Sequence, residues 1–467
     1  MIEVDVAVLG GGPGGYPAAI RAAQLGKSAA LIEQGRLGGT CLNVGCIPTK
    51  AWVQSAHAMK DAHTTFAQLG VTVPSAELDF ARVQANKGEI VDRKVTGVGG
   101  LLKANGVTVV EGRGTFADAN TIQVEGGEQV RFQNAIIATG SRPAIPPVEG
   151  LDGPRCVDST GLLAVEDVPK RLIVLGGGVI GVEFASIFNH FGSDVTVVEM
   201  LDHLIPMEDA DAVKELERAF KKSGIAVHLG AKATKATDGD DGVTLHFTDA
   251  KGTEQTVTGD LVLVATGRRA NVEDLGLEAA GVEAEKTRIP TDGRRRTNVG
   301  HIYAVGDVAG YWQLAHTAFK EGEVAAENCA GHEVEMSGVV PRCIYTDPEV
   351  AAVGLTEAQA VETYGKENVR VGKFPFQAVA RAAMFADKTG FVKTIHETGL
   401  DALVGVVVVG HSATEIVNAG VIGIDSEARI DTVSDSIAAH PTLAEAFKEA
   451  ALVALDRPLH VPPAKKR

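Results

Sequence analysis

One sequence unit constrains the fold more than any other feature, and it occurs twice. Residues 4–9 form a short apolar run typical of a buried parallel strand, and the glycine-rich segment 10–15 follows directly before a helical pattern at 18–25. A second apolar run at 28–32 ends at Glu33. Strand, glycine turn, helix, strand and acid in this order predict a dinucleotide-binding unit, whereas a lone glycine-rich turn would be weak evidence.

The glycines of this G-x-G-x-x-G pattern have separate tasks. Gly10 permits the tight turn, Gly12 lets a pyrophosphate approach the backbone, and Gly15 lets helix and strand pack closely. The positive end of the helix faces the phosphates. Glu33 is placed to accept hydrogen bonds from the ribose hydroxyls of a nucleotide.

The second copy of the unit lies 166 positions further along the chain. Strand patterns at 171–175 and 194–198 flank the glycine-rich segment 176–181, and the second strand again ends in an acid, Glu199. Two dinucleotide sites in one chain predict electron transfer between two nucleotide cofactors.

Two cysteines stand five positions apart between these copies. On a regular α-helix, Cys41 and Cys46 would point about 140° apart and lie about 7.5 Å apart along the axis, which does not suit a disulfide. We therefore expect a bent backbone, for which Gly45 supplies a permissive residue and Pro48 a stiff one.

Three interpretations of the cysteine pair compete. A zinc site is disfavoured because Cys156, Cys329 and Cys343 are scattered and form no second pair. A structural disulfide is disfavoured because the chain shows no export signal, so the pair would meet a reducing compartment. A redox-active dithiol is the interpretation that we favour, and we expect no metal.

The stretch GGTCLNVGCIPTK, residues 38–50, resembles the active-site segment of the flavin-dependent disulfide reductases, the class I pyridine nucleotide-disulfide oxidoreductases. Its Leu-Asn and Ile-Pro-Thr variants are most similar to the lipoyl-oxidising members. The resemblance implies an α/β fold with two Rossmann-like dinucleotide-binding domains and a C-terminal α+β dimerisation domain. The implied boundaries are 1–147 for the FAD-binding domain, 148–270 for the NAD-binding domain, 271–340 for a central segment that returns to the FAD domain, and 341–467 for the interface domain.

The same resemblance implies roles for the residues near the cysteines. Cys46 would lie against the flavin, Cys41 would exchange with substrate, and Lys50 would sit near the reactive ring nitrogen of the flavin. Glu183 would pair with Lys50. The alternative for Glu183 is dipole compensation in the first turn of its helix.

The first unit is expected to hold FAD, because it runs directly into the cysteine pair and because 302–307 resembles the second flavin motif of the family, with Asp307 on the ribitol. The matching strand ends 136–140 and 262–267 resemble the turns at which the chain leaves each nucleotide-binding domain in this family, although simple βα turns remain the alternative. The expected FAD contacts are Gly10, Gly12, Gly15, Glu33, Gly39, Thr40, Lys50, Gly114, Thr139, Gly140, Ser141, Asp307, Gln313, Leu314, Ala315 and His316.

The second unit is then expected to hold a nicotinamide nucleotide. A carboxylate at Glu199 would repel the 2′-phosphate of NADP, and residues 200–203 contain no arginine to receive it, so NAD is favoured. The expected NAD contacts are Gly176, Gly178, Val179, Ile180, Gly181, Glu183, Glu199 and Gly267.

A lone histidine is usually a surface or core residue, but His440 begins the run His-Pro-Thr-Leu-Ala-Glu, which matches a family motif. The resemblance implies that His440 of one subunit of a homodimer acts as base and that Glu445 orients it. A dihydrolipoyl thiolate would then attack Cys41 of the other subunit, where Cys41 and Cys46 form a disulfide within that subunit. Electrons would then pass through FAD to NAD. Imidazole suits this task because it titrates near neutral pH.

The expected partner is a lipoylated acyltransferase subunit or a lipoyl carrier protein, because no lipoyl-carrying segment precedes Met1. Mercuric reductase and the large thioredoxin reductases need further cysteines near the C-terminus, and none follows Cys343. An NADH oxidase or a quinone-reducing diaphorase, in which the cysteine pair is only regulatory, stays the alternative from another class.

Composition bounds these expectations. The 467 residues suffice for about three domains. A net charge of −16 argues against nucleic acid or an anionic membrane as partner. No 18-residue apolar run and no signal-peptide pattern occur, so we expect a cytoplasmic protein. The basic residues 465–467 are expected to form a solvated tail.

Overall fold

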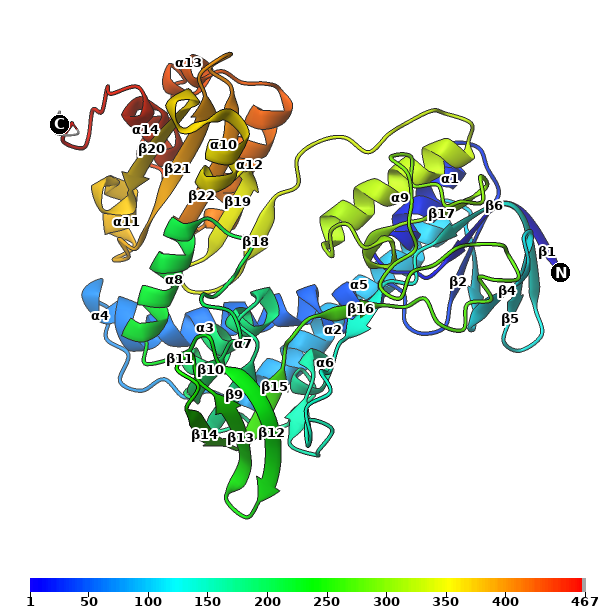
Figure 1. Cartoon of the computed structure of the whole chain (residues 1–467), viewed down its shortest axis with the longest axis horizontal. Coiled ribbons are helices and arrows are strands. Elements are labelled where there is room, and N and C mark those ends of the chain that lie inside the picture. The colour runs from blue at the N-terminus through cyan, green and yellow to red at the C-terminus, as the bar shows by residue number, and fades with distance from the viewer. Residues whose placement is uncertain (464–467) are drawn as a thin grey trace.

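The computed structural model describes residues 1–463, and the expected basic tail at 465–467 lies outside them. Figure 1 shows an N-terminal α/β unit, a second α/β unit below it in this view, and a C-terminal unit around an antiparallel sheet. The alternation of strands and helices in the sequence predicts the first two, and the structure confirms the mixed α/β class.

The N-terminal sheet has a parallel part in the order β3-β2-β1-β6, and β17 joins β6 in parallel from far along the chain. The antiparallel strands β5 and β4 extend the other half of β6. The strands are β1 (Ile2–Leu9), β2 (Ala29–Glu33), β3 (Thr108–Glu111), β4 (Gly114–Asp118), β5 (Thr121–Val124), β6 (Gln129–Ile137) and β17 (Ile302–Ala304).

Close backbone packing explains the first glycine turn, which joins β1 to α1 (Gly15–Gln24). Gly10 has φ +106°, and a Cβ there would lie 2.4 Å from the carbonyl oxygen of Ala138. A Cβ on Gly15 would lie 1.8 Å from the carbonyl oxygen of Gly10. Neither position admits a side chain, so the turn requires glycine at both.

The second unit repeats this architecture with the sheet order β11-β10-β9-β15-β8. Its parallel strands are β8 (Cys156–Val157), β9 (Arg171–Leu175), β10 (Asp194–Val198), β11 (Ala226–His228) and β15 (Leu261–Val264), with α7 (Val179–His190) after the glycine turn. An antiparallel sheet of β12 (Lys232–Gly239), β13 (Gly242–Thr248) and β14 (Glu254–Gly259) projects at the bottom of Figure 1.

Two short antiparallel strands connect the dinucleotide units. β7 (Ser141–Pro143) follows the first Ala-Thr-Gly turn, and β16 (Arg268–Ala270) follows the second. The two matching strand ends seen in the sequence therefore leave their sheets and run side by side. Asn271 reinforces the crossing, because its side chain donates to the Thr139 carbonyl at 2.9 Å.

The C-terminal unit is built on the antiparallel sheet β18-β19-β22-β21-β20. Its elements are β18 (Arg342–Ile344), β19 (Val350–Gly354), α10 (Glu357–Tyr364), β20 (Val369–Pro375), α11 (Ala380–Met384), β21 (Gly390–Glu397), β22 (Leu403–Gly410), α12 (Ala413–Asp425), α13 (Ile430–Ser434) and α14 (Glu445–Ala454). The Glu445 carboxylate at the start of α14 accepts the Thr442 N–H at 2.8 Å, which holds the preceding segment against the helix N-terminus.

Further helices cover and join these sheets. They are α2 (Gly39–Val44), α3 (Cys46–Lys60), α4 (Phe66–Gln68), α5 (Phe80–Ala104), α6 (Ser159–Leu162), α8 (Ala210–Lys222) and α9 (Ala315–Cys329). Figure 1 shows α9 beside α1, so the chain returns to the N-terminal unit after the second one. Trp52 on α3 is fully buried among Phe184, Phe188 and Phe191, which fixes α3 against α7.

Candidate active site

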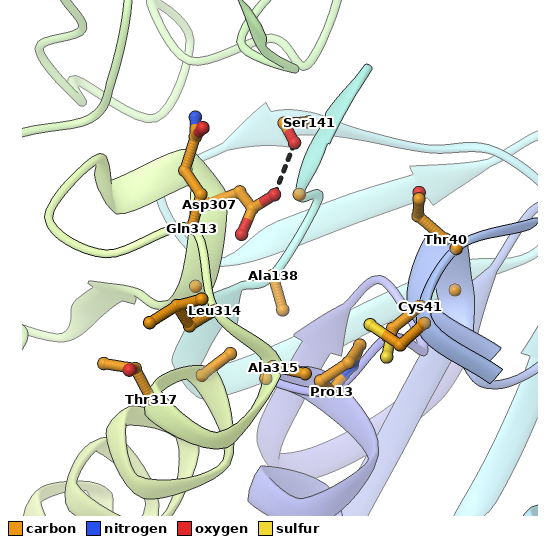
Figure 2. Close-up of a pocket in the computed structure, with 18 of the residues that line it drawn as sticks. Pro13, Thr40, Cys41, Ala138, Ser141, Asp307, Gln313, Leu314, Ala315 and Thr317 are labelled. Atoms are coloured by element: carbon orange, nitrogen blue, oxygen red, sulfur yellow. Dashed lines mark hydrogen bonds between the residues drawn. The ribbon is translucent and has the colours of Figure 1, made fainter. Parts of the chain in front are cut away.

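A single long cavity of about 1550 Å³ runs from the first glycine turn to the junction with the C-terminal unit. Glu33 lines one part of it, Asp307 another, and Cys41 and Cys46 a third. Figure 2 shows Asp307 and the 313–317 segment facing Thr40 and Cys41 across this space. Of the expected flavin contacts, all but Gly15 line the cavity, and Gly15 is instead buried in helix packing.

The predicted bend between the two cysteines is confirmed. Gly45 separates α2 from α3 with φ −143° and ψ −115°, and a Cβ there would lie 2.9 Å from the Thr40 carbonyl oxygen. This break brings the Cys41 thiol, within α2, close enough to interact with the thiol of Cys46, the first residue of α3. Both side chains are free thiols in this structure.

The two thiols differ strongly in acidity. The hydrogen bond from Cys41 and the positive charge of Lys50 outweigh burial and lower the pKa of Cys46 to about 7. Donation of that hydrogen bond, together with burial, raises the pKa of Cys41. Cys46 is therefore the sulfur that ionises first as pH rises through 7, and Cys41 keeps its proton.

Lys50 is held by Glu183, as the resemblance implied. Its Nζ donates to both carboxylate oxygens of Glu183, at 2.9 and 2.7 Å. Burial lowers the pKa of Lys50, but the Glu183 carboxylate more than offsets this and raises it. Glu183 lies in the second turn of α7, which begins at Val179, so dipole compensation in the first turn is the wrong interpretation.

Sequence reasoning missed Tyr345 in this group. The Tyr345 backbone N–H donates to Glu183 Oε1 at 2.9 Å, and Lys50 Nζ lies 4.6 Å from the centre of the tyrosine ring. The residue belongs to the C-terminal unit, so this unit contacts the Lys50–Glu183 pair through it. Its place just before the Asp347-Pro348 turn is the signal that could have suggested a tight approach.

Asp307 lines the cavity and lies in the chain between β17 of the N-terminal sheet and α9. Its carboxylate accepts a hydrogen bond from the Ser141 hydroxyl, as Figure 2 shows, and lies 3.7 Å from Arg268 Nε. Arg268 also donates to the Ser141 carbonyl at 2.8 Å. Sequence reasoning missed Arg268, although its position directly after the second Thr-Gly turn matches that of Ser141 after the first.

The two strand-end acids have the same local geometry. Glu33 accepts from the Gly11 N–H at 2.7 Å and from the Gly35 N–H at 2.8 Å. Glu199 accepts from Gly177 and from Leu201, the latter at 2.6 Å. Each carboxylate therefore fixes the loop that follows its strand onto the glycine turn, and its charge remains beside the position expected for a ribose.

Only some of the expected nicotinamide contacts line the long cavity. Val179, Ile180 and Glu183 line the long cavity, whereas Gly176, Gly178, Gly181, Glu199 and Gly267 do not. A Cβ on Gly178 would meet no atom within 4 Å, so the space beside this glycine is open to a ligand. Such open space beside a glycine at a helix N-terminus fits a pyrophosphate.

His440 lies apart from the dithiol within one chain. Its Nδ1 is 2.7 Å from Glu445 Oε1, so the predicted orienting contact is present, and its side chain is 71% exposed. Neither His440 nor Glu445 lines the long cavity.

The donor set of the cavity fits a flavin nucleotide. The glycine turn at Gly10 leaves no room for a side chain. The carboxylates of Glu33 and Asp307 can accept hydrogen bonds from ribose and ribitol hydroxyls, and Lys50 lies at the end of the cavity that holds the cysteines. Among residues 1–463, no cluster of histidine, cysteine or acidic side chains has the geometry to hold a metal ion. In the described part of the chain, none of the helices combines the length and apolar character that crossing a bilayer would need.

The family follows from comparison with known proteins. Residues 4–322 match the pyridine nucleotide-disulphide oxidoreductase family, and residues 340–451 match the dimerisation domain of that family. The chain belongs to the pyridine nucleotide-disulphide oxidoreductases and carries their dimerisation domain.

Similar proteins within the family carry a more particular name. The chain is 40% identical to a dihydrolipoyl dehydrogenase of Bacillus subtilis, with 98% of each covered, and 42% identical to a mitochondrial dihydrolipoyl dehydrogenase of Pisum sativum, with 98% of this chain and 93% of the relative covered. Among solved structures it is similar to LpdA of Mycobacterium tuberculosis, with TM-score 0.88, 28% identity and 97% and 99% coverage. It is also similar to the HOCl-induced flavoprotein disulfide reductase RclA of Escherichia coli, with TM-score 0.86, 28% identity and 96% and 99% coverage.

Proposed function

We propose that the chain is a dihydrolipoyl dehydrogenase, which oxidises a protein-bound dihydrolipoyl group through FAD with NAD as acceptor. The observation that carries this proposal is the Cys41–Cys46 pair, which lies in one cavity with the Lys50–Glu183 pair and the glycine turn of the first dinucleotide unit. Relatives with this name at about 40% identity over their full length support it.

The dithiol supplies the exchange step. In the oxidised enzyme, a dihydrolipoyl thiolate attacks Cys41 Sγ, the Cys41–Cys46 bond breaks, and Cys46 leaves as a thiolate. The second lipoyl thiol then attacks the lipoyl sulfur of the mixed disulfide, which releases Cys41 and the cyclic lipoyl disulfide. Two electrons now reside on the dithiol, and bound FAD and NAD would supply the carriers that remove them.

Lys50 keeps the low-pKa sulfur ionised after this step. Its charge stabilises the Cys46 thiolate, and Glu183 holds the ammonium in place and keeps it protonated. The elevated pKa of Cys41 means that this sulfur takes up a proton once it is released from the mixed disulfide. The different acidities thus assign leaving group and exchange thiol to different cysteines.

His440 acts from the partner subunit in this proposal. The dimerisation domain, the exposed position of the imidazole and its contact with Glu445 support a two-fold dimer in which each subunit completes the other's site. The imidazole takes the proton of the first lipoyl thiol at Nε2, because Nδ1 faces the Glu445 carboxylate. Glu445 fixes the ring and stabilises its positive charge.

Subunit complementation tests this arrangement. Cys46→Ser and His440→Gln are each expected to lower lipoamide turnover by about 10³-fold or more. A heterodimer of the two variants contains one site with an intact cysteine pair and an intact histidine, so it should recover up to about half of wild-type turnover. Equal inactivity of heterodimer and homodimers would contradict the partner role. His460→Gln, on the second histidine–glutamate pair of α14, is the matched control and should keep full activity.

The remaining assignments belong to the same proposal. The substrate arm is a lipoylated acyltransferase subunit or a lipoyl carrier protein, and the four segments 1–147, 148–270, 271–340 and 341–467 are the proposed domain units. The return of β17 to the N-terminal sheet supports the third segment. The cytoplasmic location stays a prediction.

A further inference from the structure

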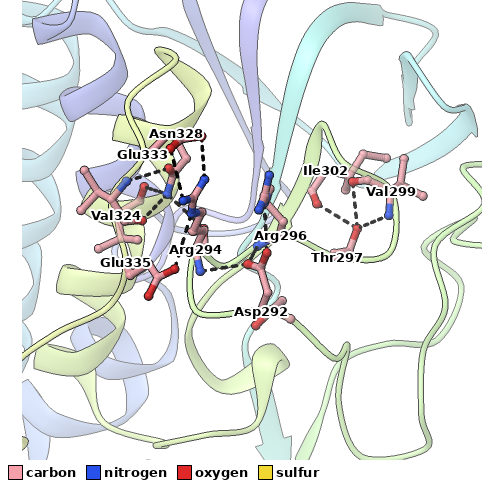
Figure 3. Close-up of polar contacts among 12 residues, drawn as sticks. Asp292, Arg294, Arg296, Thr297, Val299, Ile302, Val324, Asn328, Glu333 and Glu335 are labelled. Atoms are coloured by element: carbon pink, nitrogen blue, oxygen red, sulfur yellow. Dashed lines mark hydrogen bonds and ion pairs between the residues drawn. The ribbon is translucent and has the colours of Figure 1, made fainter.

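Three consecutive arginines, Arg294–Arg296, form an unusual basic run in a chain with a net charge of −16. The structure gives each a different partner. Arg294 Nη1 lies 3.0 Å from Glu333, and Arg296 Nε lies 3.0 Å from Asp292, as Figure 3 shows. The run is therefore neutralised within the fold and does not form a basic surface.

The middle arginine points into the protein. Arg295 has φ +66° and a side chain only 8% exposed, with its guanidinium 4.7 Å above the Tyr311 ring and its Nη1 3.6 Å from Glu321 Oε1. The turn holds this strained conformation because Asp292 Oδ1 accepts the N–H groups of Arg294 and Arg296, both at 2.9 Å. Such strain persists only where the surroundings enforce it.

Glu321 on α9 pairs with the buried Arg295 guanidinium and also accepts a hydrogen bond from the backbone. Its side chain is 1% exposed, and its Oε2 accepts the N–H of Gly306 at 2.6 Å. Gly306 has φ +72° and directly precedes Asp307. A buried carboxylate is costly unless it is paired and hydrogen-bonded, and here Arg295 supplies the pair and Gly306 the hydrogen bond.

We propose that Glu321, held by Arg295, is a positioning residue that fixes the Gly306–Asp307 turn and thereby the affinity for FAD. The inference rests on the proposed flavin site. Glu321 does not line the cavity, so it acts through Asp307, whose carboxylate also meets the Ser141 hydroxyl. Without an acceptor for the Gly306 N–H, the left-handed turn relaxes and Asp307 leaves the position required for the ribitol.

The test measures FAD affinity on apoprotein, by flavin fluorescence, in three variants. Glu321→Leu removes the acceptor and should weaken FAD binding by about 10-fold or more, whereas Glu321→Gln keeps an acceptor and should stay within about 3-fold of wild type. Glu323→Gln is the matched control, because Glu323 lies on the same helix, half-exposed and paired with Lys320. It should bind FAD as wild type does.

A double-mutant cycle separates positioning from general stability. If Glu321 acts through Asp307, Glu321→Leu should cost about 10-fold in the wild-type background and little in an Asp307→Ala background. Equal losses in both backgrounds would overturn the inference. If Glu321→Leu does not fold, Glu321→Gln decides: a loss above about 10-fold with unchanged apoprotein Tm would refute the acceptor role.

The outcome is independent of the lipoyl assignment. FAD binding is measured without substrate, so a protein that binds FAD but does not oxidise dihydrolipoamide would contradict the proposed function and leave the role of Glu321 intact.

Discussion

The two dinucleotide units share a scaffold and differ in what encloses their sites. A Cβ on Gly15 would meet the Gly10 carbonyl oxygen at 1.8 Å, and a Cβ on Gly181 would meet that of Gly176 at 1.9 Å. The first unit, however, continues into the cysteine helices and lines the long cavity along its length, whereas the glycines of the second do not line it. The difference suits a cofactor retained at the first site and a co-substrate exchanged at the second.

The loops after the second strands show how far the likeness extends. In the first unit, the Gly38 N–H donates to the Gly11 carbonyl at 2.8 Å, and in the second the Ile205 N–H donates to the Gly177 carbonyl at 2.9 Å. Gly38 has φ +94°, and Ile205 has φ +42°. The second unit thus makes the same closure with a β-branched residue in a strained conformation, so identical topology does not require identical residues.

Loss of the cysteine pair, which only the first unit has, should produce the largest change in activity. Cys46→Ser should lower dihydrolipoamide turnover by about 10³-fold or more, because the exchange needs two sulfurs, while FAD and NAD still bind. Steady-state assays beside equilibrium binding of both nucleotides measure this. Cys156→Ser, at a half-buried thiol outside the cavity, is the control, and wild-type turnover in the Cys46 variant would contradict a redox role.

Equivalent clashes in the two units should separate their functions. Gly15→Ala and Gly181→Ala each force a methyl group against a carbonyl oxygen, which costs about 1–3 kcal/mol of folding stability. Gly15→Ala should be purified with little flavin, and Gly181→Ala with full flavin but with a KM for NAD raised about 10-fold or more. Equal loss of flavin in both variants would contradict the assignment of flavin to the first unit and NAD to the second.

Substitution of the strand-end acids Glu33 and Glu199 should weaken nucleotide binding less than the glycine substitutions do. Glu199→Gln loses the charge and one of two N–H bonds, so the KM for NAD should rise about 10-fold and the preference over NADP should narrow. Glu33→Gln should still retain FAD through purification, because many other cavity contacts remain. Kinetics with both nicotinamide nucleotides check this, and an unchanged NADP preference would contradict the specificity role of Glu199.

The smallest predicted effect concerns the acidity of the dithiol. Because the pKa of Cys46 lies at about 7 rather than near the usual value for a thiol, its thiolate should appear as pH rises through 7. Lys50→Met should shift this titration upward by about 1 unit, since the nearby positive charge is lost. Thiolate absorbance of reduced apoprotein against a Cys46→Ser blank follows it, and a titration unmoved by the Lys50 change would contradict the electrostatic account.

Sequence reasoning succeeded where function is encoded locally. The glycine turns, the strand-end acids and the bend at Gly45 follow from spacing and residue type, and the structure has β9 and β10 at the predicted residues. Arg268, Tyr345 and Glu321 were not predicted, because each contributes through a contact with a residue more than 10 positions away. Such contacts depend on how the units pack, and neither periodicity nor a short motif records that packing.

The most direct test of the account is an anaerobic titration of the purified protein with dihydrolipoamide, followed by addition of NAD or NADP. Visible absorbance should show a long-wavelength thiolate-to-flavin band after dihydrolipoamide, and NAD, but not NADP, should discharge it. A spectrum that dihydrolipoamide leaves unchanged while NADH bleaches the flavin would contradict the lipoyl assignment and favour a diaphorase or another disulfide substrate.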